Sequence, residues 1–232
     1  MPKHTVFRSL LGCCVCSGLL GFHSNAAADE PPKDAPSEVK MPTHVDLCLT
    51  SAAVAPSKAD GSPWDAGGGK LKADQVKQLD GAFAAIAKMV TGDVAGVAVA
   101  IADVYKKDII KSLAKPDVFG SAELAPSGAY GAKGNKRASI ASAKKPRREF
   151  TPGFGTTVCF RNAIWGEQLR MRVSLTDKDL ADDDSIATVE VLASDVRRAF
   201  AHEKSWHVYV GDQDTKQLKF LAITVTRGSE AK

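Results

Sequence analysis

A run of aspartates is the feature of this sequence most able to do chemistry. It joins two apolar, strand-like stretches, residues 169–176 and 186–192, and it places five acids within eight positions: Asp177, Asp179, Asp182, Asp183 and Asp184. Carboxylates this close repel one another unless water or a cation offsets their charge. Side chains alternate along a strand, so the Asp177 and Asp179 carboxylates project to the same side and can converge on one ion. Calcium favours such oxygen ligands and takes about six to eight of them.

The aspartate loop also has a metal-free interpretation. Aspartate is common in solvated turns, where its carboxylate accepts hydrogen bonds from the nearby backbone. The loop is not an EF-hand, since the glycine and terminal glutamate of that motif are missing at their required spacings. The sequence of this loop alone is compatible with either a calcium site or a solvated turn.

Residues typical of catalysis are scattered along the chain. His44, His202 and His207 lie in different segments without the spacing of metal ligands. Neither serine nor cysteine occurs in the context of a nucleophile elbow. We therefore expect that the protein is not an enzyme.

A basic segment forms a second candidate site, for an anionic partner. Seven of its sixteen residues are positive: Lys133, Lys136, Arg137, Lys144, Lys145, Arg147 and Arg148. Each basic residue near an anionic membrane surface contributes about 1 kcal/mol of attraction. No aromatic residue lies between the cations for stacking on bases, so no nucleic acid is expected. The alternative is a flexible, solvated loop.

The N-terminus has the pattern of a secretory signal peptide over residues 1–28. Lys3 and Arg8 precede an apolar run at 10–22 that is too short to span a bilayer, and three alanines follow at 26–28. We expect an exported protein, periplasmic or secreted, with a lipid anchor at Cys13 as the alternative. Residues 29–42, rich in proline and charge, are expected to form a disordered linker.

Removal of that segment changes the charge and cysteine content. The formal net charge falls from +4 to +2, and Cys48 and Cys159 are the cysteines that remain of the original five. Two cysteines in an exported protein can form a disulfide, or each can be a buried apolar thiol. The sequence leaves both open.

Residues 43–228 are expected to form one mainly β domain of about eight strands. Apolar residues recur at every second position in the candidate strands, which are 44–55, 118–124, 156–161, 169–176, 186–192, 206–210 and 218–226. Within residues 71–114 the spacing changes to three and four, which predicts two helices interrupted at Thr91, Gly92 and Asp93. The sequence thus predicts a mainly β domain with an αα-hairpin near its start.

Two stretches resemble C2 domains, eight-stranded β-sandwiches that often bind calcium and phospholipid. One is SKADGSPWD at 57–65 with KPDVF at 115–119; the other is NAIWGEQ at 162–168 followed by the Asp-x-Asp step and Ser185-Ile186-Ala187. The resemblance implies an antiparallel β-sandwich in which the hairpin is an insertion in the first loop. It implies a calcium cluster of Asp60, Asp117, Asp177, Asp179 and Asp184, with Asp65, Asp182 and Asp183 as further members.

These observations lead to two functional expectations. The first is an exported, calcium-binding C2-like module whose partner is an anionic membrane lipid or an exported protein. The second is a metal-free structural or protein-interaction module that uses the hairpin or a sheet face. The sequence gives no expectation for the oligomeric state.

Overall fold

The computed structural model describes residues 39–66, 68–89, 94–155, 158–179, 182–203 and 205–229. The expected signal peptide, the lipid anchor at Cys13 and most of the linker at 29–42 lie outside these residues. Export therefore stays a prediction. Within the described part of the chain, no helix is long and apolar enough to cross a membrane.

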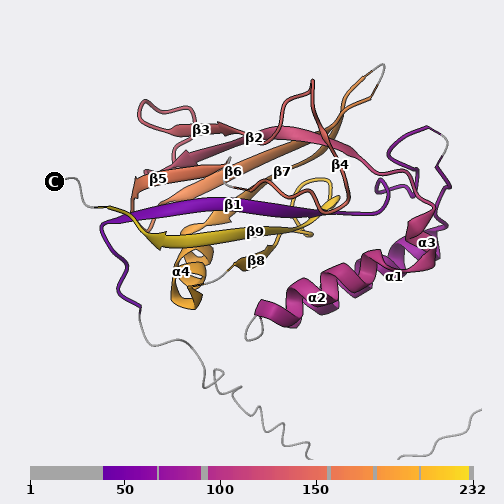
Figure 1. Cartoon of the computed structure of the whole chain (residues 1–232), viewed down its shortest axis with the longest axis horizontal. Coiled ribbons are helices and arrows are strands. Elements are labelled where there is room, and N and C mark those ends of the chain that lie inside the picture. The colour runs from indigo at the N-terminus through magenta and orange to yellow at the C-terminus, as the bar shows by residue number, and fades with distance from the viewer. Residues whose placement is uncertain are drawn as a thin grey trace, which may run out of the picture. The chain divides into compact units, whose positions relative to one another are not determined.

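The described residues contain nine strands, which form two antiparallel sheets (Figure 1). The first sheet has the order β5-β1-β9-β8, with β5 at Cys159–Ile164, β1 at His44–Val54, β9 at Leu218–Arg227 and β8 at Trp206–Tyr209. The second has the order β3-β2-β6-β7, with β3 at Lys136–Ser139, β2 at Asp117–Ala125, β6 at Arg170–Asp177 and β7 at Asp184–Leu192. The two-residue strand β4, Arg147–Arg148, also pairs with β2. The predicted mainly β sandwich is confirmed.

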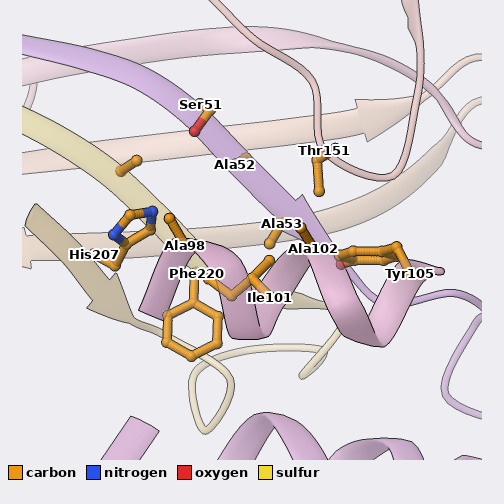
Figure 2. A pocket seen from close by; sticks show the side chains of 11 residues that line it. Ser51, Ala52, Ala53, Ala98, Ile101, Ala102, Tyr105, Thr151, His207 and Phe220 are labelled. Carbon is orange, nitrogen blue, oxygen red and sulfur yellow. The ribbon is translucent and has the colours of Figure 1, made fainter. Parts of the chain in front are cut away.

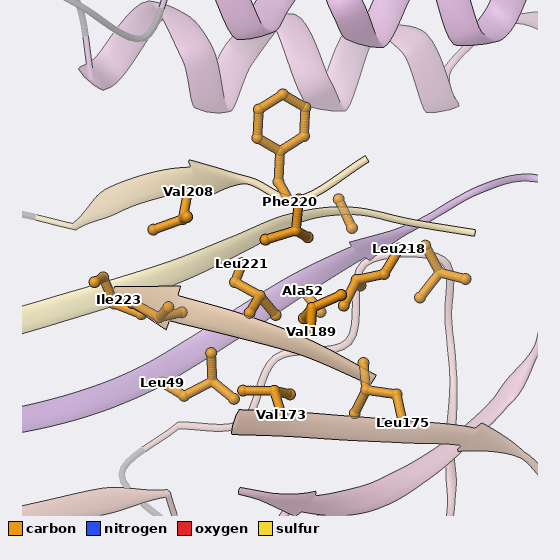
Figure 3. Packing of buried hydrophobic residues seen from close by; sticks show 14 of the residues in the cluster. Leu49, Ala52, Val173, Leu175, Val189, Val208, Leu218, Phe220, Leu221 and Ile223 are labelled. Atoms are coloured by element: carbon orange, nitrogen blue, oxygen red, sulfur yellow. The ribbon is translucent and has the colours of Figure 1, made fainter. Parts of the chain in front are cut away.

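The core lies between the two sheets because alternate side chains of each strand face inward. Leu49 of β1 lies in this layer with Val173 and Leu175 of β6 (Figure 3). β1 and β6 show the expected period of two in their burial, and the inward residues are fully buried. Apolar burial of this kind is the main source of folding free energy.

The sandwich is also cross-linked through its first sheet. Cys48 of β1 and Cys159 of β5 are register partners with Cα atoms 4.1 Å apart, and they form a disulfide. The bond joins residues 111 positions apart in sequence. It therefore ties the start of the domain to its middle.

The helices between β1 and β2 cover the outer face of the first sheet. They are α1 at Ala73–Met89, α2 at Val94–Tyr105 and the short α3 at Asp108–Lys111. Phe220 of β9 points away from the sandwich core toward these helices (Figure 3), and its ring lies 6.4 Å from that of Phe83 in α1. β9 is thus covered on both faces, which explains why most of its residues are buried, without alternation.

Three elements were not expected from the sequence. α4, Ala193–His202, follows β7 directly, and the Asp195 carboxylate accepts a hydrogen bond from the backbone N–H of Leu192 at its start. The strands β3 and β4 lie within the basic segment. Both are short and largely exposed, so their residues lack the apolar alternation by which strands are predicted.

Candidate metal site

The candidate metal site lies where β6 ends and β7 begins. Asp177 closes β6, and its backbone pairs with Asp184 of β7 on one side and Val118 of β2 on the other. Strand alternation places the Asp177 side chain on the core side, where it is 0% exposed. A carboxylate therefore occupies a position that the strand pattern would give to an apolar residue.

Only one oxygen of the Asp177 carboxylate has a protein partner among the described residues. The backbone N–H of Asp117 donates to Oδ1 at 2.6 Å, whereas Oδ2 is buried and has no hydrogen-bond partner in that part of the chain. Burial, assisted by the charges of Asp179 and Asp65, raises the pKa of Asp177 to about 7, although the Asp117 N–H and Lys58 act in the opposite direction. A buried oxygen without a partner is costly, so this site favours a proton or a cation.

Two further carboxylates meet Asp177. Asp65 comes from the loop after β1, and Asp179 follows the end of β6; one oxygen of each of the three lies within 4.8 Å of the others. Two oxygens bound to one calcium ion, each about 2.3–2.6 Å from it, are at most about 5 Å apart. The spacing of the three carboxylates is therefore suitable for a single ion.

A lysine from the first loop already approaches this cluster. The Lys58 ammonium forms an ion pair with Asp184 and lies 4.0 Å from Oδ2 of Asp179. It also lies 5.9 Å from the ring centre of Trp64, whose indole N–H donates to the carbonyl of Ala55 at 2.8 Å. Trp64 is 1% exposed, so the loop that carries Lys58 is fixed to the sandwich.

The contacts of Lys58 with Asp184 and Asp179 change the pKa values of all three groups. Burial alone would lower the pKa of Lys58, but the hydrogen bond to Asp184 and the nearby carboxylates raise it overall. The same hydrogen bond lowers the pKa of Asp184, while burial and the proximity of Asp184 raise that of Asp179. Lys58 therefore stays charged and acts as an internal counter-ion.

The other predicted ligands are placed differently. Asp60 is largely exposed; its Oδ1 accepts hydrogen bonds from the N–H and hydroxyl of Ser62, at 2.9 and 2.6 Å. Asp117 supplies its backbone N–H to the site. Asp182 and Asp183 are exposed. The structure thus brings Asp65 together with Asp177 and Asp179, with Asp184 beside them.

The basic segment is partly engaged within the protein. Lys136 donates to the carbonyl oxygens of Arg161 and Asn162, Arg137 pairs with Glu123 at 3.2 Å, and Arg148 pairs with Asp65 at 3.1 Å. Four members of the segment are exposed and have no ion pair among the described residues: Lys133, Lys144, Lys145 and Arg147. These four remain accessible to an anion.

Sequence reasoning missed Lys58 and the pairing of Arg148 with Asp65. Lysine in a polar turn gives no indication of where its long side chain ends, and Arg148 is 83 residues from its partner. Both contacts depend on how the first loop folds back over the sheet ends.

Comparisons with known proteins find distant similarity to solved structures. No family model matches the chain, and no curated protein matches it significantly. Among solved structures, the chain is similar to the tandem C2 domains of extended-synaptotagmin 2, at 10% identity and a TM-score of 0.39, over 85% of this chain and 46% of that one. A calcium-bound form of those domains matches at 9% identity and a TM-score of 0.34, over 82% and 48%. The chain spans less than half the length of each, and similarity at this level carries no information on activity.

Proposed function

We propose that this protein binds calcium at the loop end of its sandwich. Asp65, Asp177 and Asp179 would be the principal ligands, and Asp184 would join them once Lys58 withdraws. The observation that carries the proposal is the buried Oδ2 of Asp177, which has no hydrogen-bond partner among the described residues and belongs to a group of three converging carboxylates. A divalent ion would remove both the repulsion and the unmet hydrogen-bonding capacity.

We further propose that the bound ion links the protein to an anionic phospholipid surface. Calcium takes more ligands than these carboxylates provide, so phosphate oxygens can complete its coordination. The exposed Lys144, Lys145 and Arg147 would add attraction to the same kind of surface. Export, if it occurs, would make the partner an extracytoplasmic membrane lipid or another exported protein.

The calcium proposal is tested by titration calorimetry and thermal unfolding in calcium against chelator. The test variant is Asp177→Asn with Asp179→Asn, and the control is Asp182→Asn with Asp183→Asn, which removes the same number of carboxyl groups from exposed positions of the same loop. We expect a rise in Tm with calcium for the wild type and the control and none for the test variant. Equal responses of the two variants, or no response of the wild type at millimolar calcium, would refute the site.

Membrane binding is tested separately by sedimentation with vesicles of phosphatidylserine and phosphatidylcholine. We expect binding that requires calcium, and weaker binding when Lys144, Lys145 and Arg147 are replaced by glutamine. Vesicle binding that is unchanged by chelator would contradict the bridging role while leaving the calcium titration intact.

Lys58 favours a second candidate, a metal-free module in which the ammonium is the permanent cation of the site. Lys58→Met distinguishes the two. If calcium is the natural occupant, removal of the competing charge strengthens calcium binding. If the Lys58 ammonium is the natural occupant, the variant loses stability and shows no response to calcium.

A further inference from the structure

An apolar cavity of about 340 Å³ lies between α2 and the outer face of the first sheet (Figure 2). One wall is formed by Ala98, Ile101 and Ala102 of α2, and the floor by small residues of β1 together with Phe220 and Ala222 of β9. None of its lining residues belongs to the candidate metal site.

The cavity exists because the residues that meet there are small. Ala53 of β1, which pairs with Phe220 on the outer face of the sheet, lines the cavity together with Ala98 and Ala102 of α2; larger side chains there would close the space between helix and sheet (Figure 2). The volume lies within the range of small-ligand pockets, about 300–1,000 Å³.

Ser51 and Thr151 contribute hydroxyl groups to the lining, and two larger polar residues lie farther apart. His207 of β8 stands at one end; its Nδ1 is buried without a hydrogen-bond partner among the described residues, and burial lowers its pKa. Tyr105 stands at the other end, with its hydroxyl donating to the carbonyl of Val54 at 2.5 Å. The space between these residues offers apolar contacts to a ligand.

A second hollow of about 400 Å³ adjoins the cavity at Tyr105. The two share Tyr105 and Thr151 as lining residues, and the second also contains Lys111, Lys115 and Glu149. Lys111 is paired with Asp108 at 2.7 Å, whereas Lys115 is exposed and has no ion pair among the described residues. An unpaired cation therefore lines the hollow that adjoins the apolar cavity.

We propose that this cavity binds a fatty acid, with the acyl chain against the alanines of α2 and β1 and the carboxylate at Lys115. The length and narrowness of an acyl chain suit a gap between a helix and a sheet, and each methylene that leaves water adds to the affinity. The site is independent of calcium, because it uses none of the carboxylates of the metal site.

The proposal is tested by titrating the full protein with dodecanoate, below its micelle concentration and in chelator. Ala98→Phe fills the cavity from the helix side, and Val99→Phe is the matched control, since Val99 is 59% exposed and does not line the cavity. We expect saturable binding of one dodecanoate, weakened at least about tenfold by Ala98→Phe and unchanged by Val99→Phe, a tenfold change being about 1.4 kcal/mol. Thermal unfolding of each variant checks that it is folded.

The position of the carboxylate is tested with the uncharged alcohol of the same chain length. Lys115→Gln should weaken dodecanoate binding several-fold and leave dodecanol binding unchanged. Absence of saturable dodecanoate binding to the wild type, or equal binding to the two phenylalanine variants, would overturn the proposal. Equal effects of Lys115→Gln on acid and alcohol would overturn the assignment of Lys115.

Discussion

Replacing Asp177 by asparagine should remove a pH-dependent penalty from the folded protein. The pKa of Asp177 is about 7 in the folded state against an ordinary value of 3.8. Between these values the unfolded chain releases the proton while the folded chain retains it, so stability falls as pH rises from about 4 and the loss is complete above about 7. The difference corresponds to at most about 4 kcal/mol.

Asparagine suits this position because it keeps the shape of the side chain and carries no charge. Its carbonyl can still accept the N–H of Asp117, and its amide group can donate toward the carboxylates of Asp65 and Asp179. In chelator, we expect the stability advantage of Asp177→Asn over the wild type to be larger near pH 8 than near pH 5, by about 2–3 kcal/mol. In calcium near pH 8 the difference narrows, because only the wild type gains from the ion, by about 2.7 kcal/mol at a hundredfold excess over Kd.

Urea unfolding at pH 5 and pH 8, in chelator and in calcium, measures the free energy of unfolding of each protein in all four conditions. Asp182→Asn serves as the control, since Asp182 is an exposed acid of the same loop. Other groups titrate over this range, so the informative quantity is the difference between wild type and variant at each pH. If wild type and Asp177→Asn lose stability in parallel from pH 5 to pH 8 in chelator, the argument from a buried, protonated carboxyl is refuted.

Three further predictions concern stability. Replacing Cys48 and Cys159 by alanine should lower the free energy of unfolding by about 2–5 kcal/mol, measured in urea, because the bond closes a long loop. Tyr105→Phe should cost about 1 kcal/mol through loss of the hydrogen bond to Val54, with no change in far-UV circular dichroism. Phe83→Ala should cost about 3–5 kcal/mol, since the ring is fully buried between helix and sheet, and hydrogen exchange should show α1 losing most protection.

The strands of the sandwich could be predicted because burial and sequence share one period. β1, β6, β7 and β9 were placed within a few residues of their observed bounds, since each carries apolar residues on its core side. β3 and β4 could not be, because edge pairing with β2 is made by backbone groups and demands nothing of the exposed side chains. α4 was not predicted, because it begins at the residue directly after the end of β7 and no turn separates the two elements.

The residues of the candidate site also differ in whether the sequence could predict their positions. Asp177 and Asp179 could be predicted to converge, because they belong to one strand end and local alternation fixes their direction. Asp65 lies in a loop of irregular backbone, where no period relates sequence position to direction. The structure places it in the cluster, while Asp60, the other acid of that loop, instead caps Ser62.

The position of Lys58 bears on how tightly calcium can bind. Lys58 and Asp65 come from the same loop, so the ammonium is held beside the carboxylates. Its effective concentration there is set by the fold and does not depend on the solution. Calcium must displace both this cation and the proton of Asp177, and each displacement weakens its apparent affinity. We therefore expect dissociation constants near those of extracellular calcium modules, about 10⁻⁴–10⁻³ M, rather than those of intracellular sensors. Because Lys58 opposes binding only through its charge, Lys58→Met should lower the constant while Lys58→Arg should not.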